Sequence, residues 1–508
     1  MEKRWHQYVM TAVSAALVVG TWLFWWLLYP HALSYQEQYQ LFLWSGDYLA
    51  ERLSVPGGLA DWLGELIVQF YYVEWLGALL LGALFWLIHQ AAWRALRSLS
   101  ATRRPWLFYV SLLPPLFLLW LMGDESVLLS LPVAVLMTLG AAALMGRLSR
   151  GPAARAAAWA DVLMLPALYW LAGPVVWLYV LLRVGQQGWR HLWAAPWVAA
   201  VQFAAYAWLL PQWPLPAVLW GQGYYRTPLA WPRMAGGFDS EKYELIREDY
   251  LVRHERWDEL IERAKTRQVR TPFSSVCVNL ALAQKRQLAD RMFDFYQSGE
   301  DALLMPRVRD LTSMLPTAEA FWRLGMVNSA QRYMFDTQES ILNGRNSGRC
   351  TKRIAECMIV NGHYQTARKQ LALLKQSLFY RSWALEAEAL LGQEQLIAAH
   401  PVYGRLRQLR YKEDFLYSHA EIDKMLGLLF MNNHDNKMAL DYFLGQLLLK
   451  GDVQGFANYL QWAQQYGGYG RMPLGYQDAV NCIRERGNVQ GSPYGNYVRQ
   501  MTERRRQP

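Results

Sequence analysis

The chain has little cysteine, and it lacks the short motifs that mark common enzyme classes. Only four cysteines occur in 508 residues, all of them after residue 225, and none lies at zinc-ligand spacing. There is no glycine-rich phosphate loop with its lysine and no Gly-x-Ser-x-Gly elbow. The nine histidines are scattered. These absences argue against a disulfide scaffold, an ATPase, a hydrolase triad and a metalloenzyme. We therefore predict no metal and no cofactor, and we expect the cysteines to be small buried side chains.

Charge is scarce in one half of the chain only. Residues 1–225 contain 20 of the 25 Trp but only 12 Lys/Arg and 10 Asp/Glu, whereas residues 226–508 contain the other 39 Lys/Arg and 31 Asp/Glu. This partition predicts a membrane half followed by a charged soluble half. It excludes a single soluble globule, a disordered chain and a collagenous chain.

Seven apolar runs precede residue 211 and predict a membrane domain over residues 1–210. The first, Val9–Tyr29, has the length of one helical span of about 20 residues, and we interpret it as an uncleaved signal anchor. The fifth and sixth runs are short, so they could instead form one helix broken near Gly173. The later runs are Val73–Ala91, Trp106–Met122, Val127–Met145, Ala158–Leu171, Pro174–Val184 and Trp193–Leu210.

Basic and acidic residues alternate between the loops that join these runs. The loops after the second, fourth and sixth runs carry arginines, whereas residues 31–74 hold six acidic residues against one base, Arg52. Cytoplasmic loops collect Lys and Arg. Seven spans place every arginine cluster inside, whereas six leave Arg183 and Arg190 outside. We therefore predict a cytoplasmic N-terminus and an external C-terminal half, which in a bacterium means an inner-membrane protein with a periplasmic domain.

One carboxylate, Asp161, lies within the fifth run. An ionisable residue inside a span can mark a buried proton or ligand site. The commoner alternative is an interfacial carboxylate that reaches water or an arginine, and both interpretations stay open from the sequence.

Residues 31–72 predict an amphipathic outer loop of two surface helices separated by Pro56-Gly57-Gly58. The order of the first span, Glu37, the string Ser45-Gly46-Asp47-Tyr48-Leu49, this break and a second helix resembles the start of membrane glycosyltransferases that use lipid-linked sugars. The resemblance implies that Glu37 and Asp47 are the candidate catalytic residues and that a lipid-linked glycan is a partner. Glu37 would act as a base or orient the acceptor, and Asp47 would lie in a Gly-Asp turn. Such enzymes usually have more spans and a paired acidic motif, and a solvated loop carboxylate is the alternative.

The second half begins with a linker rich in Pro, Gly and Trp over residues 211–239, and residues 240–467 are helical in pattern. Within the helical part, alanine recurs with a large apolar residue four positions later, at intervals of 41, 37 and 72 residues. The four pairs are Ala289/Phe293, Ala330/Met334, Ala367/Leu371 and Ala439/Phe443. The pattern resembles tetratricopeptide repeats, whose period is near 34 residues. It predicts stacked helical hairpins, which usually bind a protein segment. Residues 468–508 predict a weakly ordered Gly/Tyr/Arg-rich tail.

The second half carries a net charge of +8, and four of its basic residues gather within nine positions. A cluster of this kind can contact anionic lipid headgroups, phosphorylated glycans or acidic partners. A solvated helix face is the plainer interpretation of the same pattern. The candidate lipid- or anion-contacting residues are Arg345, Arg349, Lys352 and Arg353.

The whole chain resembles a family of bacterial inner-membrane proteins with a spanning first half and a helical-repeat second half. The resemblance implies an architecture and no activity: an all-α protein in which a polytopic bundle of about seven spans precedes an α-solenoid-like domain. Our leading hypothesis is an inner-membrane protein whose periplasmic repeats bind a protein partner in envelope assembly. The alternative hypothesis is a membrane glycosyltransferase dependent on a polyprenyl-phosphate sugar. In either case membrane lipids are partners and nucleic acid is not.

Overall fold

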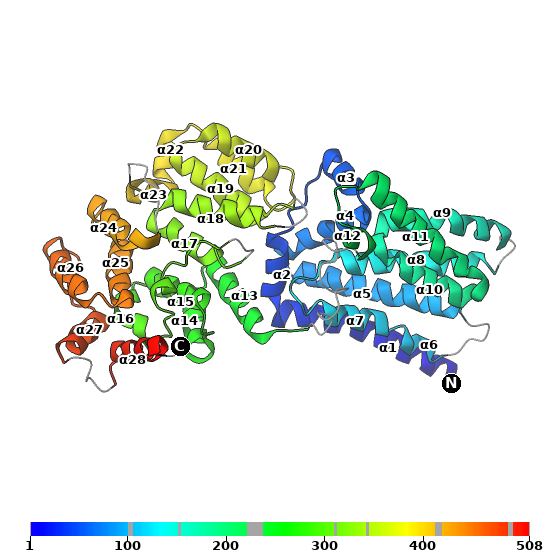
Figure 1. The fold of residues 1–508 in the computed structure, drawn as a ribbon, viewed down its shortest axis with the longest axis horizontal. Coiled ribbons are helices and arrows are strands. Elements are labelled where there is room, and N and C mark those ends of the chain that lie inside the picture. Colours follow the sequence, from blue (N-terminus) through cyan, green and yellow to red (C-terminus); the bar gives the residue numbers. More distant parts are fainter. Residues whose placement is uncertain are drawn as a thin grey trace. The chain divides into compact units, whose positions relative to one another are not determined.

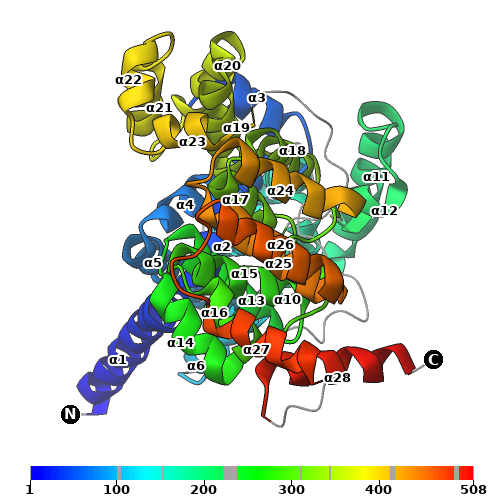
Figure 2. The same cartoon turned by 90° about the vertical axis from the view of Figure 1, so that its left-hand side faces the viewer.

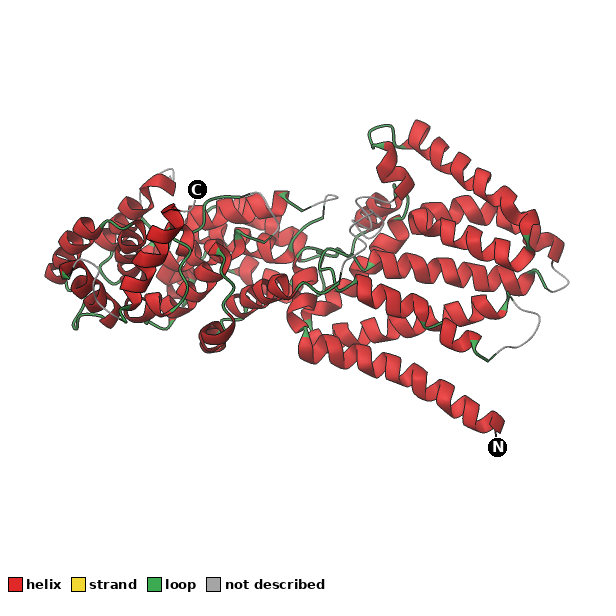
Figure 3. Ribbon diagram, turned by 60° about the horizontal axis from the view of Figure 1, so that its bottom comes forward, coloured by secondary structure: helices red, strands yellow, loops and turns green. Residues whose placement is uncertain are grey.

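The structure, a computed structural model, describes residues 2–99, 105–150, 154–220, 237–308, 312–341, 345–411, 419–485 and 491–506. Within these ranges the chain folds into helices and contains no strand (Figure 3). The chain forms two compact units. Unit 1 contains Met1–Ser240 and two short segments from the second half of the chain, Leu342–Gly348 and Gln376–Arg381. Unit 2 contains Glu241–Ile341, Arg349–Lys375 and Ser382–Pro508.

Unit 1 is a bundle of apolar helices, and in chain order a group of shorter helices comes between the first two long ones (Figure 1). The first connection, predicted as two surface helices, forms three α-helices and a 3-10 turn: α2 (Pro30–Gln38), α3 (Gly46–Leu53), α4 (Gly58–Val68) and η2 (Gln69–Tyr72). The bundle itself consists of α1 (Glu2–Leu23), η1 (Phe24–Leu28), α5 (Glu74–Arg97), α6 (Leu107–Val110), α7 (Leu113–Leu121), α8 (Ser130–Leu148), α9 (Ala154–Ala172), η3 (Gly173–Val175), α10 (Val176–Gln187), η4 (Trp189–Trp193), α11 (Ala194–Ala204), η5 (Ala205–Leu209) and α12 (Leu215–Trp220).

Several of these helices could cross a membrane. Five helical segments are long and apolar enough to do so, and the apolar helix Leu107–Leu121 is shorter. A count by length therefore gives five rather than the seven predicted from the apolar runs. The five are Gln7–Leu28, Glu74–Arg97, Ser130–Leu148, Trp159–Gln187 and Trp189–Leu209.

The segment Trp159–Gln187 is a hairpin, not one straight rod. The Asp161 carboxylate accepts a hydrogen bond from Arg183 Nε at 3.1 Å, although the two residues are 22 positions apart. In a straight α-helix that separation is about 33 Å. The chain therefore reverses at Gly173, which has φ of 73°, and α10 runs back along α9. The sequence had left open whether these two runs were separate helices, and their contacts answer that question.

The ends of α5, α8 and α10 meet at one end of unit 1. The Arg150 guanidinium donates to the Arg97 backbone carbonyl at 3.3 Å, and Gln186 Nε2 donates to Ser98 Oγ at 2.5 Å. Arg183 also donates to Ser149 Oγ at 2.9 Å. We call this the arginine end. Arg183, at the end of the sixth apolar run, was used with Arg190 to assign the side of the membrane, and its side chain is fully buried.

The predicted linker is only partly a linker. Residues 211–220 include α12, and its Val218 carbonyl accepts a hydrogen bond from the Tyr169 hydroxyl at 3.4 Å. Phe238 packs against Phe24, with 5.5 Å between ring centroids, so both ends of the predicted linker belong to unit 1. Residues 221–236 lie outside the described residues.

Unit 2 is built from shorter helices joined by tight turns. Consecutive helices pack on one another, as α17 on α18 and α24 on α25, and α24, α25 and α26 are seen together in Figure 2. The helices are α13 (Ser240–Arg253), α14 (Trp257–Arg267), α15 (Pro272–Gln284), α16 (Leu288–Arg291), α17 (Leu315–Leu324), α18 (Val327–Glu339), α19 (Gly348–Asn361), α20 (Tyr364–Leu374), α21 (Arg381–Ala389), α22 (Glu394–Ala399), α23 (Tyr403–Leu409), α24 (Ile422–Asn432), α25 (Lys437–Lys450), α26 (Val453–Gln465), α27 (Leu474–Arg484) and α28 (Pro493–Arg506), with short 3-10 turns η8 (Met292–Asp294), η9 (Glu300–Ala302) and η11 (His419–Glu421).

One turn geometry recurs in unit 2. A helix ends at a left-handed residue, and the next backbone N–H bonds to the carbonyl five positions earlier, which is the Schellman arrangement. The second helix then starts one residue later. The bonds are Arg256 to Leu251, Gln287 to Leu282, Met326 to Phe321, His363 to Met358 and Asp452 to Leu447, at 2.8–2.9 Å. The Ala and large apolar residues of the four predicted pairs are all buried.

The C-terminal segment is more regular than the sequence indicated. Residues 468–508 were predicted to be a weakly ordered tail, but they contain α27 and α28. Tyr494 and Tyr497 are buried and pack on Phe293, with ring centroids 5.0 and 5.3 Å apart. Aromatic residues spaced three apart on a helix share one face, and this face anchors α28.

Candidate functional site

Helices α3 and α4 bring a group of charged side chains into the interior of unit 1. Ser45 caps α3, because its hydroxyl accepts a hydrogen bond from the Tyr48 backbone N–H at 3.2 Å. Gly57, with φ of 85°, reverses the chain before α4. A Cβ on Gly58 would lie 1.7 Å from the Arg52 carbonyl oxygen. Only glycine therefore allows α4 to start so close to the end of α3.

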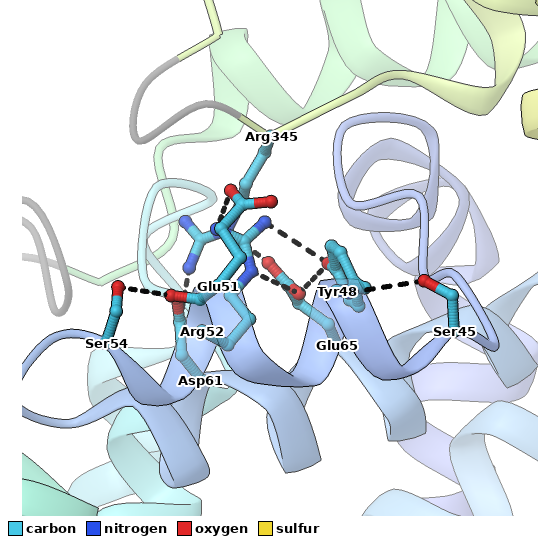
Figure 4. A network of polar contacts seen from close by, with 8 residues as sticks. All are labelled: Ser45, Tyr48, Glu51, Arg52, Ser54, Asp61, Glu65 and Arg345. Atoms are coloured by element: carbon cyan, nitrogen blue, oxygen red, sulfur yellow. Dashed lines mark hydrogen bonds and ion pairs between the residues drawn. The ribbon is translucent and has the colours of Figure 1, made fainter.

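Three side chains from the two helices form the base of the group (Figure 4). The Tyr48 hydroxyl donates to the Glu65 carboxylate, and Arg52 Nε donates to the same oxygen at 3.2 Å. The Arg52 guanidinium also lies over the Tyr48 ring, 4.8 Å from its centroid. Tyr48 and Arg52 are four apart on α3, which places them on one helix face.

A fourth and a fifth residue complete the group. Arg345, from the short segment that joins unit 1, donates from Nε to Glu65 Oε1 at 2.6 Å and from a terminal nitrogen to Asp61. Asp61 and Glu65 are four apart on α4, so they present their carboxylates side by side. We call Tyr48, Arg52, Asp61, Glu65 and Arg345 the charged cluster. All five side chains are buried.

The charged cluster balances two guanidinium groups against two carboxylates. Burial raises the pKa of Asp61, and the attraction of Arg345 opposes this shift. Burial by itself would lower the pKa of Arg345, but Asp61 and Glu65 outweigh it and raise that pKa. Burial, assisted by Glu65, also raises the pKa of Tyr48 and keeps its hydroxyl neutral. The cluster therefore holds the chain together through paired charges and offers no unpaired base.

A second set of contacts joins α2 and η2 to the other inserted segment. The Tyr380 hydroxyl donates to the Glu37 carboxylate at 2.8 Å. The Phe379 ring stacks on Tyr72, with centroids 5.2 Å apart and planes 15° apart. A Cβ on Gly348 would lie 2.5 Å from the Tyr380 ring, so glycine at this position makes room for the tyrosine.

Backbone hydrogen bonds also fix the two inserted segments to the connection between α2 and α3. The Leu41 N–H donates to the Asn346 carbonyl at 2.9 Å, and the Trp44 N–H donates to the Gln376 carbonyl at 2.8 Å. Main-chain pairing of this kind depends on the path of the chain and not on side-chain identity. The contacts of this paragraph and the preceding one, together with the charged cluster, form what we call the clasp.

The two predicted catalytic residues do not come together. Glu37 is only 4% exposed and accepts the bond from Tyr380, whereas Asp47 is exposed in the first turn of α3. Glu37 therefore faces a tyrosine within the clasp, and Asp47 faces solvent.

The four predicted lipid- or anion-contacting residues also separate. Arg345 belongs to the charged cluster of unit 1. In unit 2, buried Arg349 donates to Asp249 at 2.6 Å, and Arg353 donates to Glu319 at 2.8 Å. Lys352 Nζ lies 4.9 Å from the centroid of the Trp383 ring. Each of the three arginines is paired with carboxylates, so the four residues do not form one exposed basic surface.

Sequence reasoning missed most of the cluster residues, although one signal was present. The connection of residues 31–74 carries six acidic residues and one base, and buried carboxylates require a positive partner. That imbalance points to an arginine from elsewhere in the chain. The i, i+4 spacings of Tyr48 with Arg52 and of Asp61 with Glu65 indicate shared helix faces, but nothing local identifies Arg345 or Tyr380.

A further buried ion pair lies within the bundle. The Arg183 guanidinium and the Tyr179 hydroxyl both donate to Asp161, and His191 Nε2 lies 4.0 Å from the same carboxylate. Of the two interpretations left open by the sequence, the carboxylate that reaches an arginine matches this geometry. The pair joins the ends of α9 and α10.

We find no candidate metal centre within the described ranges, where no three His, Cys, Asp or Glu side chains gather as a ligand set. The four cysteines are all buried. Burial raises the pKa of Cys357 and Cys277, which disfavours the reactive thiolate. The thiols therefore behave as small apolar side chains.

These features define an all-helical protein with several helices that could span a membrane and with a charge-balanced clasp beside them. The chain belongs to the family described as a family of unknown function (DUF6057), whose model matches residues 5–507. No curated protein and no solved structure matches the chain.

Proposed function

We propose that this is an integral membrane protein that works as a scaffold: its membrane bundle anchors a helical domain, and that domain binds a protein partner in assembly of the cell envelope. The observation that carries the proposal is the clasp. Its carboxylates accept hydrogen bonds from arginines and from tyrosine hydroxyls. Its side-chain and backbone contacts together hold two segments of the second half of the chain. This arrangement suits mechanical attachment better than chemistry.

Contacts within unit 1 support seven passes through the membrane. Trp22 of α1 donates to the Trp75 carbonyl at 3.0 Å, and Gly82 lies against Val18, so α1 and α5 run in opposite directions. The α9–α10 hairpin contributes two passes. The remaining passes are α8, α11 and the pair α6–α7, which together count as one pass. With α1 and α5 the total is seven. The N-terminus and unit 2 would then lie on opposite sides.

The arginine end supports a direction for this topology. Arg97, Arg150 and Arg183 meet there, and positive charge accumulates on the cytoplasmic side of membrane proteins. Unit 2 would then be outside, which is the periplasm in a bacterium. A reporter fused after Pro508 tests the assignment: alkaline phosphatase should be active there and green fluorescent protein dark. The reverse result would overturn both the topology and the envelope role.

The repeated turn of unit 2 supports a solenoid of tetratricopeptide-like hairpins. At four of the turns the residue before the next helix has nearly the same backbone geometry, with φ between −84° and −80° and ψ between 59° and 73°. The small buried alanines allow close approach of paired helices. Proteins built in this way commonly present an extended surface to a peptide or protein segment.

An aromatic patch on α24 and α26 is the strongest candidate for the partner surface. Trp462 packs against Phe430 and Tyr466, with centroids 5.7 and 5.3 Å apart, and His434 stacks on Tyr466 at 5.4 Å. Tyr459 and Tyr466 are 46% and 44% exposed. Tryptophan and tyrosine dominate the energetics of protein interfaces, so the exposed Tyr459 and Tyr466 beside the half-buried Trp462 favour partner binding.

Site-specific cross-linking in intact membranes tests the partner proposal. A photo-reactive phenylalanine analogue at position 459 should yield a discrete cross-linked species, and Tyr466→Glu should abolish it by placing a charge in the patch. The matched control is the same analogue at Leu396, which is 55% exposed on α22, with Leu396→Glu as the control charge. Equal cross-linking from both positions, or none from 459, would refute the patch.

Glycosyl transfer from a polyprenyl-phosphate sugar stays the alternative, and it requires Glu37 to reach a substrate. The burial of Glu37 against Tyr380 weighs against that role. Comparing the envelope glycans of a deletion strain after rescue by the natural protein, Glu37→Gln or Asp47→Asn tests it directly. Loss of a glycan with Glu37→Gln, while Tyr380→Phe retains it, would favour the enzyme over the scaffold.

A further inference from the structure

Unit 1 contains an apolar groove of about 990 Å³ between α7 and the helices α5, α8 and α10. None of its lining residues carries a charge. They include Ala95, Leu96, Leu113, Leu139, Leu178 and Leu182. We call this space the α7 groove.

The third apolar segment explains why a groove forms there. The segment Leu107–Leu121 is 15 residues long, about 22 Å as a helix, whereas the hydrocarbon core of a bilayer is about 30 Å thick. It is also divided into α6 and α7 just before Pro114-Pro115. Proline has no backbone N–H and so cannot form the hydrogen bond that would continue the helix. The short α7 packs on α5, and the space toward α8 and α10 is left to another occupant.

Three residues of α7 connect the groove with the surroundings of the bundle. Leu113, Leu116 and Phe117 line the groove, and all three are also exposed on the surface of unit 1. In a membrane this surface faces lipid tails. Water is unfavourable in an apolar space of this size, whereas a hydrocarbon chain can enter from the side.

We propose that the α7 groove is a binding site for one acyl chain of an anionic phospholipid, with the headgroup at the arginine end. The length is suitable: Leu139 of α8 lines the groove and lies nine residues before Leu148 at the arginine end of that helix, about 14 Å along it, close to the roughly 15 Å depth of one leaflet. The site takes a lipid from the leaflet on the arginine side.

The charged residues near the two ends of the groove indicate at which end the lipid headgroup lies and that the headgroup is anionic. Ala95 and Leu96 line one end of the groove, and the exposed Arg94 and Arg97 flank them in the last turn of α5. The chain after α7, at the other end, carries Asp124 and Glu125 instead. A phosphate group is attracted to the first end and repelled from the second.

Lipid retention by the purified full-length protein tests the proposal. The protein is washed in detergent, and bound lipid is measured by native mass spectrometry with a mixture of phosphatidylglycerol and phosphatidylethanolamine as probes. Leu178→Trp fills the groove and should remove most of the tightly bound phosphatidylglycerol. Leu181→Trp is the matched control, because Leu181 is on the same helix and 70% exposed but does not line the groove.

The headgroup has its own pair of variants. Arg94→Gln with Arg97→Gln should remove the preference for phosphatidylglycerol, whereas Arg190→Gln, an exposed arginine on η4, should retain it. Equal lipid loss from the two Trp variants, or none from either, would overturn the site. Equal retention of both lipids by the natural protein would overturn the anionic assignment, and recovery of an isoprenoid lipid in their place would overturn the choice of a phospholipid. None of these outcomes bears on partner binding by unit 2.

Discussion

Replacing Arg345 with methionine tests whether the charged cluster holds unit 1 together. The natural cluster contains two arginines and two carboxylates, so its formal charge is zero, and Arg345→Met leaves it at −1. Asp61 and Glu65 would then remain buried with Arg52 as the one guanidinium. Removing one partner of a buried ion pair costs about 3–5 kcal/mol, because the remaining charge cannot return to water.

A second substitution separates charge balance from packing. Asp61→Asn in the same chain restores neutrality, since Glu65 keeps its bonds to Tyr48 and Arg52. We expect the double variant to recover more than half of the loss, whereas Asp61→Asn alone leaves a buried positive charge and destabilises. The four proteins form a cycle whose interaction free energy measures the coupling.

Heat unfolding of the full chain in detergent provides the measurement. Tryptophan emission reports mainly on unit 1, because 20 of the 25 tryptophans precede residue 226. At about 2–4 °C per kcal/mol for a unit of this size, Arg345→Met should lower the midpoint by roughly 6–20 °C. Arg405→Met, at an exposed position of unit 2, should change it little. If the double variant is no more stable than Arg345→Met, the charge-balance argument is wrong.

Two further predictions concern a buried acid and a tight turn. Burial raises the pKa of Glu248 to about 8 from 4.5, so between these values the folded chain holds a proton that the unfolded chain has lost. Stability should therefore fall with rising pH across that window, by up to about 1.4 kcal/mol per pH unit. Glu248→Gln should flatten the profile, whereas Glu262→Gln, at an exposed pair, should leave it; parallel profiles for all three proteins would contradict the assignment. In unit 1, Gly58→Ala puts a Cβ 1.7 Å from a backbone oxygen, and Gly46→Ala meets nothing within 4 Å. The first should destabilise by at least about 1–3 kcal/mol and the second should be neutral in the same heat assay, and equal midpoints would show that the turn relaxes.

Much of the helical architecture was predictable because it depends on local patterns. Long apolar runs indicate membrane-length helices, and the Ala pairs at helical spacing indicate buried helix contacts. Where the sequence was ambiguous, at residues 158–184, length alone favoured one helix and arginine placement favoured two. The Asp161–Arg183 contact shows the reversal, which depends on a pairing across 22 residues that no local window contains.

The C-terminal segment shows the opposite error. Its Gly, Tyr and Arg content suggested weak order, yet Tyr494 and Tyr497 are anchored by Phe293. A tyrosine-rich helix becomes ordered when its aromatic face can pack on another surface of the protein. That surface comes from residues about 200 positions earlier, so composition was a poor guide.

The candidate site was predictable in its location but not in its membership. The connection between the first two long helices was recognised as more than a linker, but its excess of acid was used only to assign the side of the membrane. Glu37 was singled out by resemblance, and its hydrogen bond to Tyr380 gives it a place in the clasp. Arg345 was grouped with Arg349 and Arg353 because they are close in sequence, although the three arginines pair with different carboxylates.

The sequence by itself determined the two-part character of this protein, since the segregation of tryptophan from charge over hundreds of residues is a property of composition and needs no contact to be read. It also determined the helical class, because periodicity is local. Only the tertiary structure decided that two short pieces of the second half belong with the helices of the first. Buried charges find their partners through the fold, and a pairing between Glu65 and Arg345, 280 residues apart, leaves no trace in the neighbourhood of either residue.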